Sequence, residues 1–424
     1  MAAPNPWMIL PFGLLLGAMA FAPLAAPAWW LRNYARIAFA LGAVTLGYYL
    51  FILRDAPRVW HTGHDYASFI ALIGSLYVVS GGIHIRVRAE TTPRANVVFL
   101  FAGALLANIL GTTGAAMLLI RPWIRMNQSR VAAHHIIFFI FIVANVGGCL
   151  TPIGDPPLFL GYLQGVPFWW VARHCWPMWA IGVGLLLAMF YVVDRINMAG
   201  QGRAARDVRA VRAGLEGQEA WGIQGLSNLI FLAVILGAVF VRRPIFLREA
   251  LMLGAAAGSY FTTGKAIHAA NDFNFHPVQE VAALFAGIFA TMMPALDWLN
   301  VNAHALLGGQ PSPAIFYWGT GILSTLLDNA PTYLGFLSAL SGASGASEMA
   351  ELVARHSLSL EAIGIGAVFF GAATYIGNGP NFMVKAIADR QGIRTPSFPG
   401  MVGRFTAPFL LPALVAIWLI FFRG

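Results

Sequence analysis

The chain has 424 residues, of which 58% are hydrophobic and 10% are charged, and its formal net charge is +9. Soluble domains carry about 25% charged residues, so a deficit spread over the whole length excludes a soluble protein with one anchor and indicates an all-α polytopic membrane protein. The basic residues lie in short blocks between apolar segments, as the positive-inside rule requires, which excludes nucleic-acid binding as the reason for the charge.

A membrane span needs about 20 mostly apolar residues, and ten segments of this chain meet that requirement. They lie near residues 7–25, 34–54, 66–86, 130–165, 171–193, 224–241, 246–262, 278–297, 360–388 and 403–422. No charged residue precedes the first segment, so we interpret it as a retained span and not as a signal peptide. The fourth and ninth segments contain Gly, Pro and polar residues at their centres, which predicts broken helices.

Two further apolar segments, 96–124 and 313–340, have polar turns at their centres, with NILGTTG at 108–114 and DNAPT at 328–332. Each half of such a segment is too short to cross a bilayer. We therefore predict two re-entrant helical hairpins, each of which enters and leaves on one side. Two ordinary spans joined by a tight turn are the alternative.

The long polar stretch at 194–223 is rich in Gly, Ala and Arg, and predicts a solvated linker between two halves of the chain. If this linker is cytoplasmic and each span changes side, most of the 26 Lys and Arg residues fall inside the cell. This arrangement predicts a multi-pass protein of the cell (inner) membrane with both termini outside the cytoplasm.

The two broken segments resemble each other, since residues 151–160 read TPIGDPPLFL and residues 374–383 read TYIGNGPNFM. We expect residues 1–193 and 224–424 each to form five spans and one hairpin. Because five is an odd number, the second half would be inverted relative to the first, which is typical of alternating-access transporters. Chance similarity between two Gly- and Pro-rich segments is the alternative.

The hairpin tips precede the broken segments at similar distances. Asn108 lies 43 residues before Thr151, and Asn329 lies 45 residues before Thr374. A broken helix presents unpaired carbonyl oxygens, which suit a hard cation such as Na+, and unpaired N–H groups. We therefore predict an ion or substrate site where each tip meets a break. Its predicted residues are Asn108, Thr112, Thr113, Asn145, Thr151, Gly154, Asn329, Thr332, Thr374, Asn378 and Asn381.

Two carboxylates, Asp155 in the first break and Asp328 in the second tip, are the predicted coupling residues. A charge at membrane depth costs at least a few kcal/mol and indicates a function. Burial favours the protonated carboxyl and a bound cation favours the carboxylate, which predicts proton–cation exchange. The alternative is that each Asp caps a half-helix. Lys385 and Glu280 are weaker candidates for a relay. The alternatives are that Lys385 reaches toward the membrane interface and that Glu280 is a charge at a helix end.

The strings NVGGCLTPIGDPPLFLGYLQGVPF, LLDNAPTYLGF and TYIGNGPNFMVKAIA resemble the ion-transporter superfamily, and within it the branch of sodium:proton antiporters and citrate transporters. The resemblance covers nearly the whole chain. It implies a scaffold subdomain that dimerises and a transport subdomain that moves like an elevator. It also implies Na+ ligands at the tips and breaks, which with the two carboxylates are Asn108, Asn145, Asp155, Asp328, Asn329 and Asn378.

The tips differ from those of the sodium/dicarboxylate members, which carry Ser-Asn-Thr at both tips. Together these features predict a secondary transporter, not an enzyme, that exchanges Na+ or Li+ for protons. We expect it to need no cofactor other than Na+ and to form a homodimer in lipid. The alternative is a Na+-coupled symporter of citrate or another di- or tricarboxylate. An intramembrane aspartyl protease would require Gly-x-Gly-Asp, whereas residues 153–155 read IGD.

Overall fold

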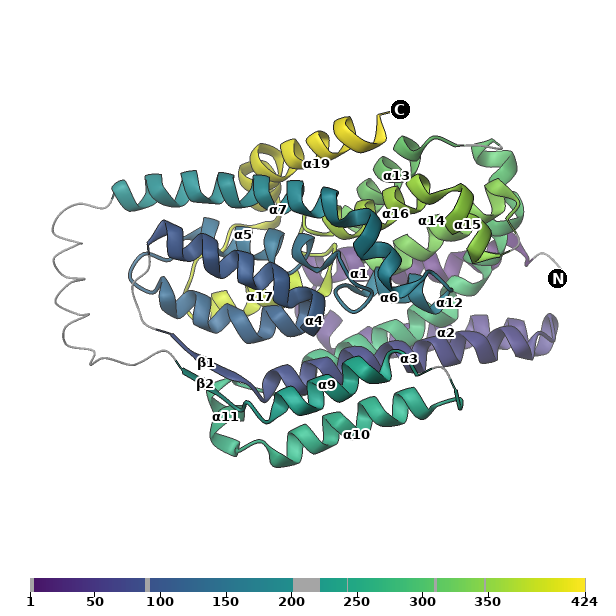
Figure 1. Ribbon diagram of the computed structural model, residues 1–424. Coiled ribbons are helices and arrows are strands. Elements are labelled where there is room, and N and C mark those ends of the chain that lie inside the picture. Colours follow the sequence, from purple (N-terminus) through teal and green to yellow (C-terminus); the bar gives the residue numbers. More distant parts are fainter. Residues whose placement is uncertain are drawn as a thin grey trace.

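Helices make up most of the described chain (Figure 1). The computed structural model describes residues 4–87, 92–200, 222–241, 243–308, 311–346 and 348–423. Two short strands, β1 (His84–Arg86) and β2 (Gly222–Gln224), pair antiparallel, with Ile85 opposite Ile223. The protein is thus an all-α polytopic membrane protein with one small strand pair in its described part.

The helices follow one another in this order: η1 (Pro6–Ile9), α1 (Leu10–Ala25), α2 (Pro27–Gly47), η2 (Tyr48–Ile52), α3 (Ala56–Gly81), α4 (Pro93–Met126), α5 (Ala133–Ile142), η3 (Val146–Gly148), α6 (Pro156–Leu163), α7 (Phe168–Ala199), α9 (Asn228–Ala238), α10 (Leu247–Thr262), α11 (Lys265–Ala270), α12 (His276–Leu307), α13 (Pro313–Leu326), α14 (Asn329–Ser344), α15 (Met349–Arg355), α16 (Ser357–Gly371), α17 (Gly379–Arg390), α18 (Phe398–Met401), η4 (Val402–Leu410), α19 (Leu411–Ile417) and η5 (Trp418–Phe422).

Helices occupy all ten predicted spans, but fewer are long and apolar enough to cross a membrane by themselves. By length and composition, six such stretches occur among the described residues: Pro6–Pro23, Pro27–Ile52, Pro93–Met126, Phe168–Ala199, His276–Leu307 and Phe398–Phe422. Pro93–Met126 is not one of the ten predicted spans but the first predicted hairpin, and its helix is interrupted at Gly111. The bent pair α15–α16, with 99° between its helices, is a possible seventh. The other predicted spans fall short for physical reasons. The broken segments are divided, α9 and α10 are short, and α3 carries Arg58, His61, His64 and Asp65 in its first half.

The first predicted hairpin is a helix that doubles back at Gly111 (Figure 1). Gly111 has φ +73° and ψ 156°, a backbone conformation that residues with a Cβ rarely adopt. The two limbs of α4 pack antiparallel, because the rings of Phe99 and Trp123 stack 5.5 Å apart at equal sequence distances from Gly111. The predicted turn at 108–114 is therefore correct. Entry and exit on one side of the membrane stays a prediction.

The second hairpin consists of α13 and α14, and its turn is Leu327–Asp328. A Cβ on Gly319 would lie 2.9 Å from the ring of Phe336, again at equal distances from the turn. The predicted tip at 328–332 is displaced, because Asn329 already begins α14. Pro331 fits there, since a proline in the first helical turn sacrifices no intrahelical hydrogen bond.

Both predicted breaks are present. The first separates α5 from α6 over residues 143–155, with only η3 between them, and the second separates α16 from α17 over residues 372–378. Proline begins or nearly begins each following helix, at Pro156 and Pro380. These prolines fix φ near the helical value and lack the N–H that the first turn would leave unpaired.

Helix α7 continues through Ala199, so the polar linker predicted from residue 194 begins later than expected. Residues 201–221 of that linker lie outside the described residues. Figure 1 shows α7 ending at the left, on the side of β1 and β2, whereas both termini lie toward the right. The helices α3, α9 and α10 pack together along the lower edge, and α4, α5 and α17 lie side by side above them.

Candidate functional site

The two breaks and the second hairpin tip meet at Asp155. This side chain is 1% exposed. Its Oδ1 accepts a hydrogen bond of 2.6 Å from Thr112 Oγ1 and one of 3.1 Å from Asn378 Nδ2. Its Oδ2 accepts one of 2.6 Å from Asn329 Nδ2. The first hairpin, the second hairpin and the second break therefore each contribute one donor to a single buried carboxyl group.

A row of buried amides connects the two breaks next to Asp155. Asn378 also donates to Asn145 Oδ1 at 3.1 Å, and Asn145 donates to Asn381 Oδ1 at 2.6 Å. Asn381 in turn donates to the carbonyl oxygens of Gly371 and Thr374, at 2.8 Å each. Because side-chain amides supply the bonds that a continuous helix would make internally, both breaks are held open and in contact.

Each hairpin tip is tied to its own break by the same pair of hydrogen bonds. In the first half, Thr112 N donates to Gly154 O at 2.7 Å, and Thr151 Oγ1 donates to Asn108 O at 2.6 Å. In the second half, the corresponding distances are 3.2 Å from Asn329 N to Gly377 O and 2.6 Å from Thr374 Oγ1 to Thr325 O. The two halves therefore repeat one local geometry.

These bonds correct the alignment of the two tips. The sequence comparison paired Asn108 with Asn329, but the hydrogen bonds pair Asn108 with Thr325 and Thr112 with Asn329. The sequence comparison matched the two Asn residues because they are the same residue type. Structural equivalence is instead defined by the residues whose backbone groups form hydrogen bonds with the break. Thr112 and Asn329 are thus the equivalent residues, and both donate to Asp155.

Asn108 is engaged by the backbone of the first break. Its Nδ2 donates to the carbonyl oxygens of Ala104 and Gly147, at 2.9 and 2.7 Å, and its Oδ1 accepts from Leu150 N at 2.7 Å. The hydroxyl of Thr151 accepts from Gly154 N at 3.1 Å, and that of Thr374 accepts from Gly377 N at 3.2 Å. These side chains hold the shape of the breaks.

Asn329 has an oxygen that is not used by the protein. The residue is fully buried, its Nδ2 is bonded to Asp155, and within the described residues its Oδ1 has no hydrogen-bond partner. A buried polar atom without a partner costs about 1–3 kcal/mol. The amide oxygen lies on the side chain that already contacts the carboxylate, so it is available to a ligand bound there.

Asp328 and Asp155 have different roles in the structure. Asp328 is the N-cap of α14, and its Oδ1 accepts a hydrogen bond of 3.0 Å from Ala330 N. Asp155 occupies the N-cap position of α6 but makes no side-chain cap bond. The capping alternative is therefore correct for Asp328 and wrong for Asp155. Thr332 donates to the carbonyl oxygen of Asp328 at 2.9 Å, and Thr113 is half-buried beside Thr112.

The two predicted relay residues are not brought to Asp155 by any contact in the described structure. Lys385 pairs with Asp389 one turn later at 2.5 Å, and both side chains are partly exposed. Glu280 is half-buried near the start of α12. The pairing with partly exposed Asp389 is consistent with the alternative for Lys385, a side chain that reaches toward the membrane interface.

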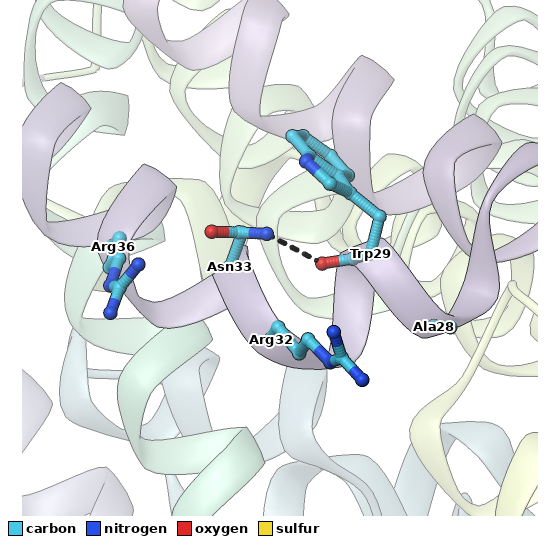
Figure 2. A pocket seen from close by; sticks show the side chains of 5 residues that line it. All are labelled: Ala28, Trp29, Arg32, Asn33 and Arg36. Atoms are coloured by element: carbon cyan, nitrogen blue, oxygen red, sulfur yellow. Dashed lines mark hydrogen bonds between the residues drawn. The ribbon is translucent and has the colours of Figure 1, made fainter.

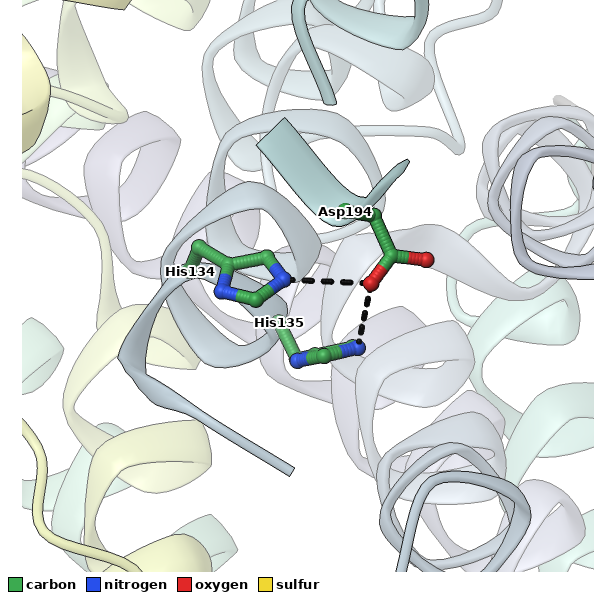
Figure 3. A group of neighbouring side chains, drawn as sticks. All are labelled: His134, His135 and Asp194. Carbon is green, nitrogen blue, oxygen red and sulfur yellow. Dashed lines mark hydrogen bonds and ion pairs between the residues drawn. The ribbon is translucent and has the colours of Figure 1, made fainter. Parts of the chain in front are cut away.

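A second buried polar cluster, which the sequence analysis missed, lies at the base of the first hairpin (Figure 3). Figure 3 shows both histidines pointing toward Asp194; His134 Nε2 lies 3.2 Å and His135 Nε2 lies 3.1 Å from its Oδ1. Arg130 donates to both carboxylate oxygens, and Asn96 Nδ2 donates to Oδ2 at 2.9 Å. All five side chains are at least nine-tenths buried.

The hydrogen-bond pattern argues against a metal ion in this cluster. The backbone N–H of Ala132 donates to His135 Nδ1 at 3.2 Å, so the ring proton of a neutral His135 is on Nε2. A metal ligand needs a lone pair on Nε2. Arg130 adds a fixed positive charge on the same carboxylate. We interpret the five residues as an anchor that joins α4, α5 and the end of α7.

Removing the carboxylate of this anchor is expected to lower stability strongly. Asp194→Asn removes the carboxylate that pairs with the buried guanidinium of Arg130, and breaking a buried ion pair costs about 3–5 kcal/mol. We expect a clear fall in the Tm of the detergent-purified protein. Asp389→Asn, which removes the exposed partner of Lys385, is the matched control, since exposed pairs contribute about 0–1 kcal/mol. Equal Tm values for the two variants, or a Tm that rises with Zn2+, would contradict the anchor.

Comparison with known proteins identifies the class of the chain. A family model described as "Putative citrate transport" matches residues 2–422. A protein of Mycobacterium bovis (strain ATCC BAA-935 / AF2122/97), named an uncharacterized transporter, is 25% identical over 393 residues, covering 85% of this chain and 87% of the relative. A second uncharacterized transporter, from Mycobacterium tuberculosis (strain ATCC 25618 / H37Rv), has the same identity and coverage.

Proposed function

The chain belongs to this citrate-transport family, and from that premise we propose that it is a secondary transporter that exchanges Na+ (or Li+) for protons, with Asp155 as the exchanging carboxylate. The observation that carries the proposal is the contact set of Asp155. Its three side-chain donors, Thr112, Asn329 and Asn378, are all uncharged. Neutral donors stabilise a carboxylate but do not cancel its charge.

A buried charge needs compensation, and two small ions can provide it here. A proton can bind Asp155, or a cation can bind between its oxygens and nearby neutral oxygens. The unused Oδ1 of Asn329 supports the second possibility. Carboxylate, amide and carbonyl oxygens are the ligands that hard cations prefer. Proton and cation therefore compete for one group, which is the requirement for exchange.

Competition at one carboxylate also explains why exchange would be obligatory. The site is neutral when Asp155 carries a proton and when it carries Na+, and it is charged only when empty. Moving an unpaired charge through the membrane costs at least a few kcal/mol, so the empty site would cross rarely. We propose that the tips and breaks move together, in an elevator-type mechanism with a homodimeric scaffold, and that Asp328 acts mainly by capping α14.

Na+-coupled symport of citrate or another carboxylate is the second candidate, and the description of the matching family favours it. In that case Na+ bound at Asp155 would remove the repulsion between the carboxylate and the anion. The two candidates differ in what Na+ moves. Exchange moves a proton in the opposite direction without any anion, whereas symport moves Na+ and citrate in the same direction.

Proteoliposomes with a trapped pH dye distinguish these candidates. We expect an inward Na+ pulse to make the lumen alkaline in citrate-free buffer, and K+ to have no such effect. Radiolabelled citrate, added with Na+, should not accumulate. Exchange would be refuted, and symport favoured, if citrate uptake depended on Na+ and a Na+ pulse in citrate-free buffer caused no pH change.

We also propose that the protein lies in the inner membrane with both termini outside the cytoplasm. The positive-inside distribution of Lys and Arg supports this orientation. Both termini lie away from the end of α7 in Figure 1, as an arrangement with both termini on one side requires.

A further inference from the structure

A basic groove lies on helix α2, away from the breaks (Figure 2). It encloses about 660 Å³ and is lined by Ala28, Trp29, Arg32, Asn33 and Arg36. The two arginines are four residues apart and therefore one turn apart on the same face. Figure 2 shows the Asn33 amide turned toward the backbone of Trp29, to whose carbonyl oxygen it donates at 2.9 Å.

The two guanidinium groups have no acidic partner in the described part of the protein. Arg32 and Arg36 are both exposed, and no ion pair joins either to an Asp or Glu of the described residues. Trp29, which also lines the groove, is 54% exposed. Two exposed positive charges on one face of α2 thus have no acidic partner among the described residues.

The position of the groove along the helix indicates where that partner is. The apolar stretch Pro27–Ile52 has 26 residues. Only 22% of its most apolar 18-residue segment is buried inside the protein. At 1.5 Å per residue it is about 39 Å long, whereas the hydrocarbon core is about 30 Å thick. If Ile52 lies at one boundary, the first six residues extend into the headgroup layer. Arg32 then lies among the headgroups, and Arg36 lies about one turn inside the boundary.

We propose that this groove binds the phosphate of an anionic phospholipid, held by Arg32 and Arg36. Arginine forms paired hydrogen bonds with phosphate oxygens, and an arginine near the hydrocarbon boundary reaches toward the headgroups. Trp29 has the amphipathic ring that is enriched at this depth. A lipid is a better occupant than a second copy of the chain. Two copies packed on this face about a two-fold axis would bring like charges together.

A groove on α7 shows what distinguishes the proposed site. That groove encloses about 560 Å³ and is lined by Trp169, Ala172, Arg173 and Trp176. It has aromatic rings at the same kind of position but only one arginine. We therefore assign the preference for an anionic headgroup to the arginine pair of α2 and not to exposed Trp residues in general.

Native mass spectrometry of the delipidated full-length protein tests the proposal. Phosphatidylglycerol is titrated into the wild type, and phosphatidylcholine serves as the zwitterionic probe. We expect the double variant Arg32→Gln/Arg36→Gln to lose about thirtyfold in phosphatidylglycerol affinity, the order expected for two basic residues at an anionic surface. Arg32→Lys/Arg36→Lys keeps both charges but not the paired hydrogen bonds, so it should lose less affinity than the Gln variant but still bind more weakly than the wild type. Inorganic phosphate should not compete, since the lipid tails contribute to affinity.

The matched control is Arg94→Gln/Arg423→Gln, which removes the same number of charges from exposed positions outside the groove. Equal phosphatidylglycerol binding by wild type and the α2 variant, or equal loss in the control, would overturn the proposal. The proposal would also fail if the wild type bound phosphatidylcholine as well as phosphatidylglycerol, or if inorganic phosphate displaced phosphatidylglycerol completely. A dimer that dissociates in the α2 variant without a change in lipid binding would instead identify an interface between copies.

Discussion

Asp155→Asn is expected to abolish Na+-driven proton movement in proteoliposomes while the protein stays folded. The asparagine has no proton that ionises, so a cation bound beside it can no longer displace one. The local hydrogen bonds can be kept, because Asn329 has an unused Oδ1 that can accept from the new amide after the Asn329 side chain turns over. The measurements are the rate of the pH-dye signal after a Na+ pulse, and the Tm in detergent.

Asp328→Asn is the matched control for this experiment. Asparagine is as good an N-cap residue as aspartate, so the bond to Ala330 N and the start of α14 should be kept. We expect exchange to continue in this variant. Loss of exchange in Asp328→Asn with normal activity in Asp155→Asn would reverse our assignment. Loss in both variants would mean that the two carboxylates act together.

Gly154→Ala is expected to prevent correct folding or to reduce stability severely. A Cβ on Gly154 would lie 1.9 Å from the carbonyl oxygen of Gly148, a backbone atom that cannot move away without opening the break. Overpacking in a core costs about 1–3 kcal/mol when neighbours can adjust, and here they cannot. We expect Gly154→Ala to lose the monodisperse peak in size-exclusion chromatography. Its Tm should fall further than that of an alanine variant at any other single glycine of the breaks.

Alanine variants of two other glycines, Gly377 and Gly184, are the comparisons for the Tm of Gly154→Ala. A Cβ on Gly377 would lie 2.6 Å from Ser324 O and 2.7 Å from Gly371 O, so Gly377→Ala should be harmful but less so. Nothing lies within 4 Å of a Cβ on Gly184 in α7, and alanine there should stabilise the helix by about 0.5–1 kcal/mol. If Gly154→Ala had the same Tm as Gly184→Ala, the close approach inside the first break would be disproved.

A feature of this fold could be predicted from the sequence when it depends on residues that are close together in the chain. The breaks were predictable because Gly, Pro and polar residues are clustered at the centres of apolar segments, as at 151–157 and 374–381. A single proline does not suffice, since Pro177 and Pro294 lie inside continuous helices. The boundary of the second tip was displaced, since Asp328 can serve either as a turn residue or as a cap. Only the observed bond to Ala330 N distinguishes the two.

The contacts between distant segments required the folded structure. Asp194 stands at the start of a polar stretch, and composition assigned it to the solvated linker, yet it is fully buried. Its partners His134 and Arg130 lie 60 and 64 residues earlier in the chain. No local pattern reports a pairing over such a separation.

Apolar spans, their interruptions and the two carboxylates follow from residue chemistry and from the thickness of a bilayer, which act on each segment independently. Which carboxylate stands at the centre follows from packing, because Asn329 is 174 residues from Asp155 and Asn378 is 223 residues from it. Hydrogen bonds over these separations form only after both halves have folded against each other. The difference between a capping Asp328 and a central Asp155 is therefore a property of the assembled protein.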